Sequence, residues 1–557
     1  MIRPSCLKSS AVLLTVLSGL AAACGDDSSP KAVSTPDPST ATGRTSDAAT
    51  TVGADGGVAS VPSLVTIADG PLSGLALGST HQFLGIPYAK PPIGDLRFQP
   101  PQANAPWMAT RDATQFGKRC AQLASAVLMN AASSDEDCLY LNVWTPSPTG
   151  KAPVMVWIHG GGNVNGSANE PLPYVGGGLF YDGSHLAKNG VVVVSLNYRL
   201  GVLGFFSHKG LADEGGNVGN QGLLDQVAAL KWVQSNIAKF GGDPDNVTIF
   251  GESAGSLDVC LHVASPKARG LFHKAISESG GCTTMQTTQA DAQKSIDDFA
   301  TQLGCTGTPA EALTCLRKKT TDELVTATTT TKFGPALDGT VFPDQPRALY
   351  DKGDIAKVPI ILGSNMDEGT LFVSAQVTDE AGLRAAIGAQ YGAASVDAIM
   401  AAYPIANYAA ATPNPYQAVL ARVVGDAILV CTTYDAAVRA SAAGSSVFMY
   451  NFNIPVTVGT NLGATHGSEL TYVFGTSKLF TAAGQASSDH MQRYWTNFAK
   501  TGDPNGGSDL KWPAFSGTAN VRMNIAEPDF TVVNDFRASE CAFWRAAYDQ
   551  KFAAAAK

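Results

Sequence analysis

Basic residues are scarce in this sequence, and no stretch concentrates them. The chain of 557 residues has 38 Lys and Arg against 47 Asp and Glu, which gives a formal net charge of -9 at pH 7. A nucleic-acid-binding domain usually carries a basic patch or stripe, so nucleic acid is not an expected partner. Clusters with metal-ligand spacing are missing, as is a glycine-rich dinucleotide fingerprint after a strand. The sequence therefore predicts neither a metal nor another cofactor.

A long apolar run is found only at the N-terminus. Arg3 and Lys8 give it a positive start, and Ala11–Ala23 is apolar but too short to span a bilayer. We therefore predict a signal peptide at residues 1–23. The following Cys24 resembles the cysteine of a bacterial lipobox, although Ala21 stands where a branched residue is usual. We expect a lipid anchor on Cys24 in an exported protein of bacterial type, and the alternative is an ordinary signal peptide cut nearby.

Residues 24–61 lack large apolar side chains and are rich in Ser, Thr, Asp, Ala, Pro and Gly. Such a segment buries too little surface to fold, so it is predicted to be a disordered tether. The remaining residues, 62–557, show no internal repeat and no apolar stretch long enough for a membrane span. They are expected to form the folded part, with membrane contact only through Cys24.

Strand and helix patterns alternate in the folded part. Residues 152–158 and 191–196 are short apolar runs, and the second is rich in β-branched residues, as in a fully buried strand. Residues 221–240 have apolar side chains at helical spacing, and 246–250 is again strand-like. This order predicts the α/β class, with a large, mostly parallel sheet covered by helices on both faces. In such a sheet the active site lies at the carboxyl ends of the strands.

A nucleophile motif follows the strand at 246–250. Gly251-Glu252-Ser253-Ala254-Gly255 fits G-x-S-x-G between a predicted strand and a predicted helix, where a sharp turn needs small neighbours. We predict Ser253 as the nucleophile, with the backbone N–H of Ala254 as one oxyanion donor. Further donors are expected from His159-Gly160-Gly161-Gly162, which follows the strand at 152–158.

A serine nucleophile needs a histidine base that a carboxylate orients. The histidines after Ser253 are His262, His273, His466 and His490. His262 and His273 follow Ser253 so closely that they are expected on the adjoining helix and strand, where a packed or surface role is favoured. His490 lies in an amphipathic helix pattern. His466 stands in a polar, glycine-bearing loop, which makes it the predicted base. The acid is expected just after the strand at 360–363, where residue spacing does not distinguish Asp367 from Glu368.

Several ordered motifs resemble the type-B carboxylesterase family, which includes cholinesterases and liver carboxylesterases. They cover residues 63–547 and include Phe83 to Ala89, Glu136 to Asn142, Asn197 to Gly201, Gly219 to Gln226 and Phe250 to Ser256. The resemblance implies an α/β-hydrolase fold and hydrolysis of carboxylic esters. It also implies Glu368 as the acid, oxyanion donors at Gly161, Gly162 and Ala254, and supporting residues Glu252 and Ser279. Glu252 has a second interpretation, as a purely structural ion-pair partner.

The resemblance also implies a disulfide framework, which suits an oxidising compartment. The pairs that it implies are Cys120–Cys138, Cys305–Cys315 and Cys431–Cys541. Cys260 and Cys282 remain; we expect a fourth bridge between them, and the alternative is two buried thiols.

The substrate is expected to be a small-molecule ester. Cholinesterases have a tryptophan ten residues before the cysteine of Glu-Asp-Cys, but Leu128 stands there in this chain, so a cation–π site for choline is missing. Counted back without gaps from Phe333-Gly334-Pro335, Thr329 and Thr331 stand opposite the acyl-pocket aromatics of acetylcholinesterases. The smaller side chains favour a roomier acyl pocket and therefore short- to medium-chain or bulky esters. Two alternatives remain: a non-catalytic cell-surface adhesion relative, which the complete Ser253, Glu368 and His466 set disfavours, and a lipase acting on aggregated lipid, which would need a long apolar lid.

Overall fold

The computed structural model of the protein describes residues 60–125, 130–171, 178–215, 219–328, 333–373, 376–456, 462–517 and 520–555. The predicted signal peptide, Cys24 and the tether as far as residue 59 lie outside these residues. Strand β1 (Ser60–Thr66) includes the last two residues of the predicted tether.

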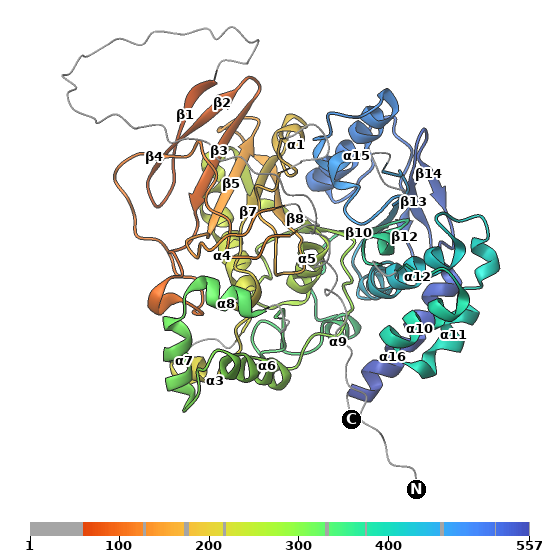
Figure 1. The fold of residues 1–557 in the computed structure, drawn as a ribbon. Coiled ribbons are helices and arrows are strands. Elements are labelled where there is room, and N and C mark those ends of the chain that lie inside the picture. Colours follow the sequence, from red (N-terminus) through yellow and green to blue (C-terminus); the bar gives the residue numbers. More distant parts are fainter. Residues whose placement is uncertain are drawn as a thin grey trace, which may run out of the picture.

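One sheet of 14 strands forms the centre of the molecule (Figure 1). Its main path runs in the order β1-β2-β3-β5-β7-β6-β8-β9-β10-β11-β13-β14, while β4 pairs with β2 and β12 with β11. The strands are β2 (Pro71–Leu77), β3 (Thr80–Pro87), β4 (Arg111–Asp112), β5 (Tyr140–Thr145), β6 (Ala152–Ile158), β7 (Val192–Leu196), β8 (Gly242–Glu252), β9 (Lys274–Glu278), β10 (Ile360–Asn365), β11 (Val447–Phe452), β12 (Ala514–Phe515), β13 (Arg522–Ile525) and β14 (Thr531–Val533).

The sheet is parallel in its centre and antiparallel at both ends. Strands β7, β6, β8, β9, β10, β11 and β13 are parallel to their neighbours in this run. By contrast, β1, β2, β3 and β5 pair antiparallel on one side, and β14 pairs antiparallel with β13 on the other. The α/β prediction is confirmed, and the mixed ends refine it.

Alternate side chains of the central strands enter two separate cores. On β6, Val154, Val156 and Ile158 pack with α4 (Gln221–Asn236), α5 (Ala254–Ala264), α9 (Pro346–Asp351) and α13 (Cys431–Ala442). Met155 and Trp157 point to the opposite face and pack with α1 (Ser184–Lys188), α14 (Leu470–Phe474) and α15 (Ala482–Thr501). Both faces are covered, so the central strands are apolar throughout.

Further helices surround this frame on two sides. A third core lies under α2 (Gly201–Gly204), α3 (Lys209–Asp213), α6 (Gln289–Gln302), α7 (Pro309–Lys318) and α8 (Thr321–Ala327). A fourth joins α10 (Glu380–Tyr391), α11 (Val396–Ala402), α12 (Pro415–Gly425) and α16 (Ala538–Ala555), at the lower right of Figure 1.

One continuous helical segment, Pro415–Ala442, is long and apolar enough to cross a membrane by length and composition. It comprises α12, the π-helical turn Asp426–Val430 and α13. Within its most apolar window 72% is buried inside the protein. This burial is that of a core helix in a folded domain.

Four disulfides connect the described cysteines. Three pair the cysteines that the resemblance implies, Cys120–Cys138, Cys305–Cys315 and Cys431–Cys541, and the fourth joins Cys260 to Cys282. The bridge Cys431–Cys541 links α16 to α13, because Cys431 is the first residue of α13 and Cys541 lies in α16. Its two ends are 110 residues apart in sequence.

Candidate active site

Ser253 lies on the sharp turn between β8 and α5. Its backbone has φ 57° and ψ -121°, a strained conformation for a residue with a side chain. The flanking glycines are required sterically: a Cβ on Gly251 would lie 2.6 Å from the carbonyl oxygen of Ile158, and one on Gly255 would lie 2.1 Å from it. The N–H of Ser253 donates to the carbonyl of Glu278 on the neighbouring strand β9 (2.9 Å). The turn is therefore locked against both strands that flank β8.

Glu368 begins the short 3-10 helix Glu368–Leu371 after β10. The backbone N–H of Asn365 donates to its Oε1 atom at 2.7 Å. Close packing against α12 places this turn, because a Cβ on Gly369 would lie 1.8 Å from the carbonyl oxygen of Ala421. The glycine after Glu368 is thus needed for the helix to approach.

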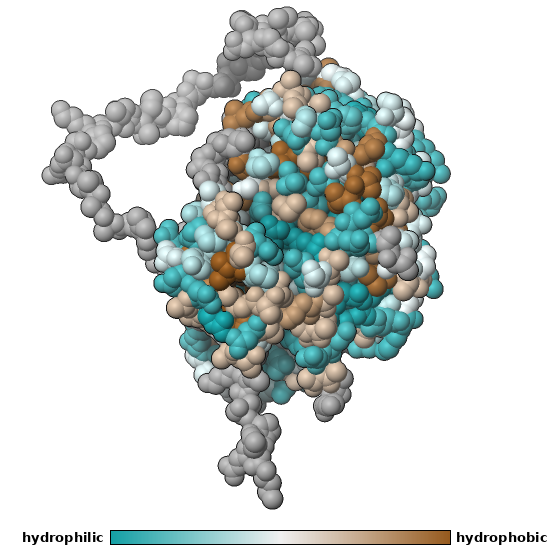
Figure 2. Space-filling model, turned by 90° about the vertical axis from the view of Figure 1, so that its right-hand side faces the viewer, coloured by the Kyte–Doolittle hydropathy of each residue, from teal (hydrophilic) through white to brown (hydrophobic). Residues whose placement is uncertain are grey.

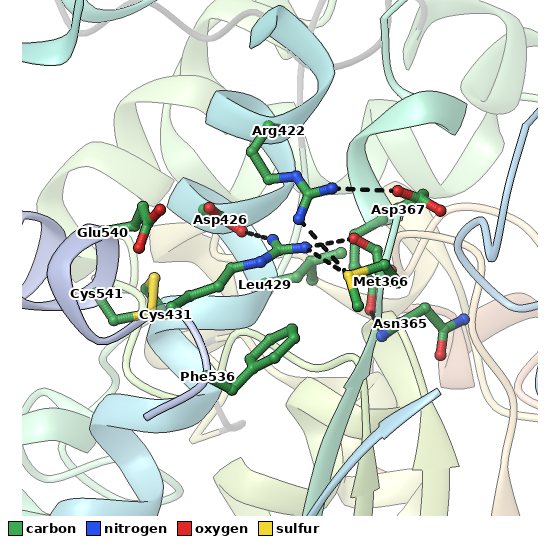
Figure 3. Close-up of polar contacts among 12 residues, drawn as sticks. Asn365, Met366, Asp367, Arg422, Asp426, Leu429, Cys431, Phe536, Glu540 and Cys541 are labelled. Carbon is green, nitrogen blue, oxygen red and sulfur yellow. Dashed lines mark hydrogen bonds and ion pairs between the residues drawn. A yellow bond between two sulfur atoms is a disulfide. The ribbon is translucent and has the colours of Figure 1, made fainter. Parts of the chain in front are cut away.

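Two arginines hold the residues just before Glu368 (Figure 3). Arg422 on α12 reaches Asp367 Oδ1 at 3.3 Å, and Arg537 donates to the carbonyl of Met366 at 2.6 Å. Arg537 also pairs with buried Asp426, and the Cys431–Cys541 bridge lies beside this pair. The second acid candidate, Asp367, therefore faces an arginine rather than an imidazole.

His466 meets Glu368 at the carboxyl ends of the central strands. Its Nδ1 lies 2.6 Å from Glu368 Oε2, so the ring donates to the carboxylate. Its Nε2 lies 3.1 Å from Oε1 of Glu252, the residue before Ser253. Within the described part of the chain Nε2 has no hydrogen bond of good geometry. The structure thus brings together Glu252, Glu368 and His466 from three distant segments.

The loop that carries His466 is fastened to the turn after β10. Asp367 and Ala464 exchange two hydrogen bonds, one from each backbone N–H, at 3.0 Å each. The amide of Asn365 donates to the carbonyl of Thr465 at 2.8 Å and also to Glu469. Acid and histidine are therefore positioned by the same few residues.

Opposing effects set the protonation of this cluster. Burial alone would lower the pKa of His466, but the charges of Glu252 and Glu368 raise it well above its usual value. Burial raises the pKa of Glu252, and the nearby imidazole opposes that rise. The imidazole is therefore stabilised in its protonated form until the pH is alkaline.

Two further buried carboxyls belong to this cluster, and the sequence reasoning missed both as functional candidates. Burial raises the pKa of Glu278, at the end of β9, to about 8, and Trp495 donates to its Oε1 at 2.8 Å. Burial and the neighbouring carboxylates raise the pKa of Glu469 well above its usual value. The sequence did hold a signal for each, since Glu278 directly precedes Ser279 and Glu469 stands three residues after His466.

The other histidines after Ser253 have different partners. His262 is fully buried on α5, with Nε2 2.6 Å from Gln226 Oε1, and burial lowers its pKa to about 4. Nδ1 of His273 accepts from the backbone N–H of Val247 at 3.1 Å. On α15, His490 contacts Asp509 at 2.7 Å. None of these three contacts involves Ser253 or Glu368.

The glycine loop after β6 lies against the serine turn. A Cβ on Gly160 would lie 2.9 Å from Oε2 of Glu252 and 3.0 Å from Cβ of Ser253. Gly161 and Gly162 follow with positive φ angles of 103° and 68°, and Gly162 is exposed. Ala254 is the first residue of α5. Two backbone segments that could donate to a developing oxyanion thus meet at Ser253.

The other predicted positions add no side-chain hydrogen bond to this cluster within the described part of the chain. Ser279 is buried at the end of β9 with φ 60°, and its hydroxyl has no hydrogen-bond partner among the described residues. Leu128, Thr329 and Thr331, the positions that favour short- to medium-chain or bulky esters over choline esters, lie outside the described residues. Among the described residues no group of three or more His, Cys, Asp or Glu is arranged to hold a metal ion.

Comparison with known proteins gives consistent matches over almost the whole folded part. The Carboxylesterase family model matches residues 61–544. A cholinesterase of Mus musculus is 33% identical over 531 residues, which cover 86% of this chain and 86% of the relative. A liver carboxylesterase of Sus scrofa is 35% identical over 519 residues, which cover 83% of this chain and 88% of the relative.

Proposed function

Because the chain belongs to the carboxylesterase family and is a carboxylic-ester hydrolase, we propose that it cleaves esters by acyl transfer to Ser253. The observation that carries this proposal is the 2.6 Å contact between His466 Nδ1 and Glu368, with Nε2 turned toward the residue beside Ser253. The contact between acid and histidine is the part of a serine hydrolase triad that orients the base.

In the first step His466 takes the proton of the Ser253 hydroxyl, which attacks the ester carbonyl. The backbone N–H groups of Gly161, Gly162 and Ala254 stabilise the oxyanion that forms. His466 then protonates the leaving alcohol, while Glu368 holds the imidazole in the correct tautomer. Water repeats these steps on the acyl-enzyme and releases the carboxylic acid.

Glu252 competes with Ser253 for the same nitrogen of His466. In the structure Nε2 is 3.1 Å from the Glu252 carboxylate. Ser253 adjoins Glu252, and both side chains flank the same spot on Gly160. We therefore assign Glu252 as the partner of His466 in the resting enzyme, where the imidazole is protonated. When Nε2 loses its proton, it leaves Glu252 and accepts a hydrogen bond from the serine hydroxyl. Catalytic hydrogen bonds often form fully only with substrate bound.

The proposed substrates are small carboxylic esters, either with short- to medium-length acyl chains or bulky. Leu128 replaces the aromatic residue that would bind a quaternary ammonium, so choline esters are disfavoured. On the face shown in Figure 2, hydrophobic residues form small groups among hydrophilic ones, without a broad apolar surface among the described residues on that side. Soluble esters are preferred to aggregated lipid in this proposal, because no long apolar lid segment stands out in the sequence.

We also propose that the protein is exported from a bacterial-type cell and tethered through lipidated Cys24. Four disulfides suit an oxidising compartment. Labelling with radioactive palmitate followed by cell fractionation tests the anchor. A soluble, unlabelled product would leave only an ordinary signal peptide.

The decisive experiment uses an organophosphonate probe and the Ser253→Ala variant. We expect one probe molecule per wild-type chain, attached at Ser253, and no labelling or ester turnover in the folded variant. An unlabelled wild-type protein without turnover would favour the non-catalytic adhesion role. Equal or higher rates on micellar esters than on dissolved ones would favour a lipase.

A further inference from the structure

A buried hydrogen bond connects the glycine loop directly to the helix that follows Ser253. Nδ2 of Asn163, the residue after Gly162, donates to Oδ1 of Asp258 on α5 at 3.0 Å. Both side chains are buried, with 2% and 0% of their surface exposed. The bond therefore crosses between the two segments that supply the proposed oxyanion donors.

The two residues lie close to those donors along the chain. Asn163 directly follows Gly162, and Asp258 stands four residues after Ala254, about one helical turn away. A shift of the loop relative to α5 would change the spacing between the N–H groups of Gly161 and Gly162 and that of Ala254. Oxyanion stabilisation depends on such preset spacing.

The side chain and the carbonyl of Asn163 are both held in place. Its Oδ1 lies 3.0 Å from the Tyr198 hydroxyl, which is also 2.9 Å from the carbonyl oxygen of His159. Its own carbonyl accepts from the N–H of Gly201 at 2.8 Å. The backbone of Asn163 has φ 59°, a left-handed conformation that asparagine tolerates better than most residues. These contacts fix both the side chain and the turn.

Asp258 has a second hydrogen-bond partner, on α4. Nε2 of Gln226 on α4 donates to its Oδ2 at 2.6 Å, and Oε1 of Gln226 accepts from His262 at 2.6 Å. Burial raises the pKa of Asp258 to about 7, although its two hydrogen bonds oppose that rise. Above that pH the carboxylate accepts from both amides. The chain of contacts thus runs from α4 through α5 to the glycine loop.

We propose that Asn163 and Asp258 are a positioning pair that sets the spacing of the oxyanion donors, a role that rests on the ester hydrolysis proposed above. Neither side chain touches the reacting atoms. They act through the backbone of Gly162 and Ala254.

The test exchanges the two residues. Asn163→Asp alone places two carboxyl groups together, which can bond only if they share a proton. Asp258→Asn alone leaves one acceptor oxygen where the carboxylate had two, so it can accept from Asn163 or from Gln226 but not from both. In the double variant the new carboxylate at position 163 would accept from Tyr198 and from the new amide at position 258, whose oxygen would accept from Gln226. We expect each single to lower kcat about 100-fold on a p-nitrophenyl ester at pH 8.5, with KM changed little. The double exchange should recover kcat to within about threefold of the wild type, because it restores one donor and one acceptor across the same gap.

A trifluoromethyl ketone supplies the readout that a merely structural role would not change. Its adduct with Ser253 carries an oxyanion, so its affinity should fall in step with kcat in the singles and recover in the double variant. Tyr198→Phe is the milder variant if a single fails to fold, with an expected loss of about tenfold in kcat. Tyr494→Phe is the matched control, since its hydroxyl donates to the carbonyl of Leu510 in the loop after α15.

Wild-type kcat and ketone affinity in folded singles or in Tyr198→Phe would overturn the pair's role. So would a folded double exchange as impaired as the singles, or an equal loss in Tyr494→Phe. A wild-type protein that neither turns over esters nor binds the phosphonate would instead refute the proposed hydrolysis. The two failures are therefore distinguishable before any variant is made.

Discussion

The two halves of the site are built by opposite means. Around His466, four buried glutamates come from the ends of β8 and β9, the turn after β10 and the histidine loop, and burial and neighbouring charges shift the pKa values of His466, Glu252, Glu278 and Glu469. Around the glycine loop backbone shape dominates, because a Cβ added at Gly160, Gly251 or Gly255 would lie under 3 Å from another atom, and one buried polar bond braces the loop. Proton transfer needs tunable charge, whereas oxyanion binding needs fixed N–H groups.

The largest effect is expected on the charged half. Replacing Glu368 with Ala removes the carboxylate at 2.6 Å from His466, and we expect kcat to fall by about 10³- to 10⁴-fold because the imidazole loses its orientation. Steady-state kinetics with phosphonate titration of active sites measures this. Asp367→Asn is the matched control, with a much smaller loss; equal losses would mean that Glu368 has no special role.

The shape-based half can be broken by one methyl group. Gly255→Ala would place a Cβ 2.1 Å from the carbonyl oxygen of Ile158. We expect the free energy of unfolding to fall by about 3 kcal/mol and kcat to fall with it. Denaturant unfolding and kinetics would show this. In Gly334→Ala, where nothing lies within 4 Å of the new Cβ, stability should stay within about 0.5 kcal/mol.

The coupling within the charged half predicts a shift of the pH profile. Neutral His466 is the base, so activity rises as the pH passes through its pKa, which the Glu252 charge raises. Glu252→Gln removes that charge, lowers the pKa and moves the rise to lower pH by about one to three units. A profile of kcat/KM against pH tests this, with Glu214→Gln, an exposed partner of Arg317, as the control. An unmoved profile would exclude Glu252 as the resting partner.

The smallest effect concerns stability rather than turnover. The pKa of Glu278 is raised to about 8 by burial, so the folded protein holds a proton that the unfolded chain releases near its ordinary value. Stability is thus favoured at low pH and lost as the pH rises toward 8, with a slope of at most about 1.4 kcal/mol per unit. Glu278→Gln should flatten this slope, as measured by unfolding at several pH values, while Trp495 keeps its acceptor. An identical slope would contradict the shift.

Local patterns predicted most of the frame. The strand expected at 152–158 coincides with β6, that at 191–196 contains β7, and the helix expected at 221–240 is α4 followed by a 3-10 turn at 237–240. Burial on both faces of a parallel strand leaves a continuous apolar run, which is visible in sequence. The antiparallel ends were not predicted, because pairing direction depends on partners far along the chain.

The sequence by itself indicated the serine turn and the glycine loop, since each is a short motif directly after a predicted strand, although the atoms that their glycines avoid belong to the other segment. It left Asp367 and Glu368 equal until family resemblance favoured the second, and spacing did not reveal the carboxyl cluster or the Asn163–Asp258 bond. Those were decided by tertiary structure, because burial and the approach of α12, α5 and the histidine loop depend on contacts between segments far apart along the chain. The protonation state of a buried group depends on the neighbours that folding brings together, so it cannot be predicted from any single segment of the sequence.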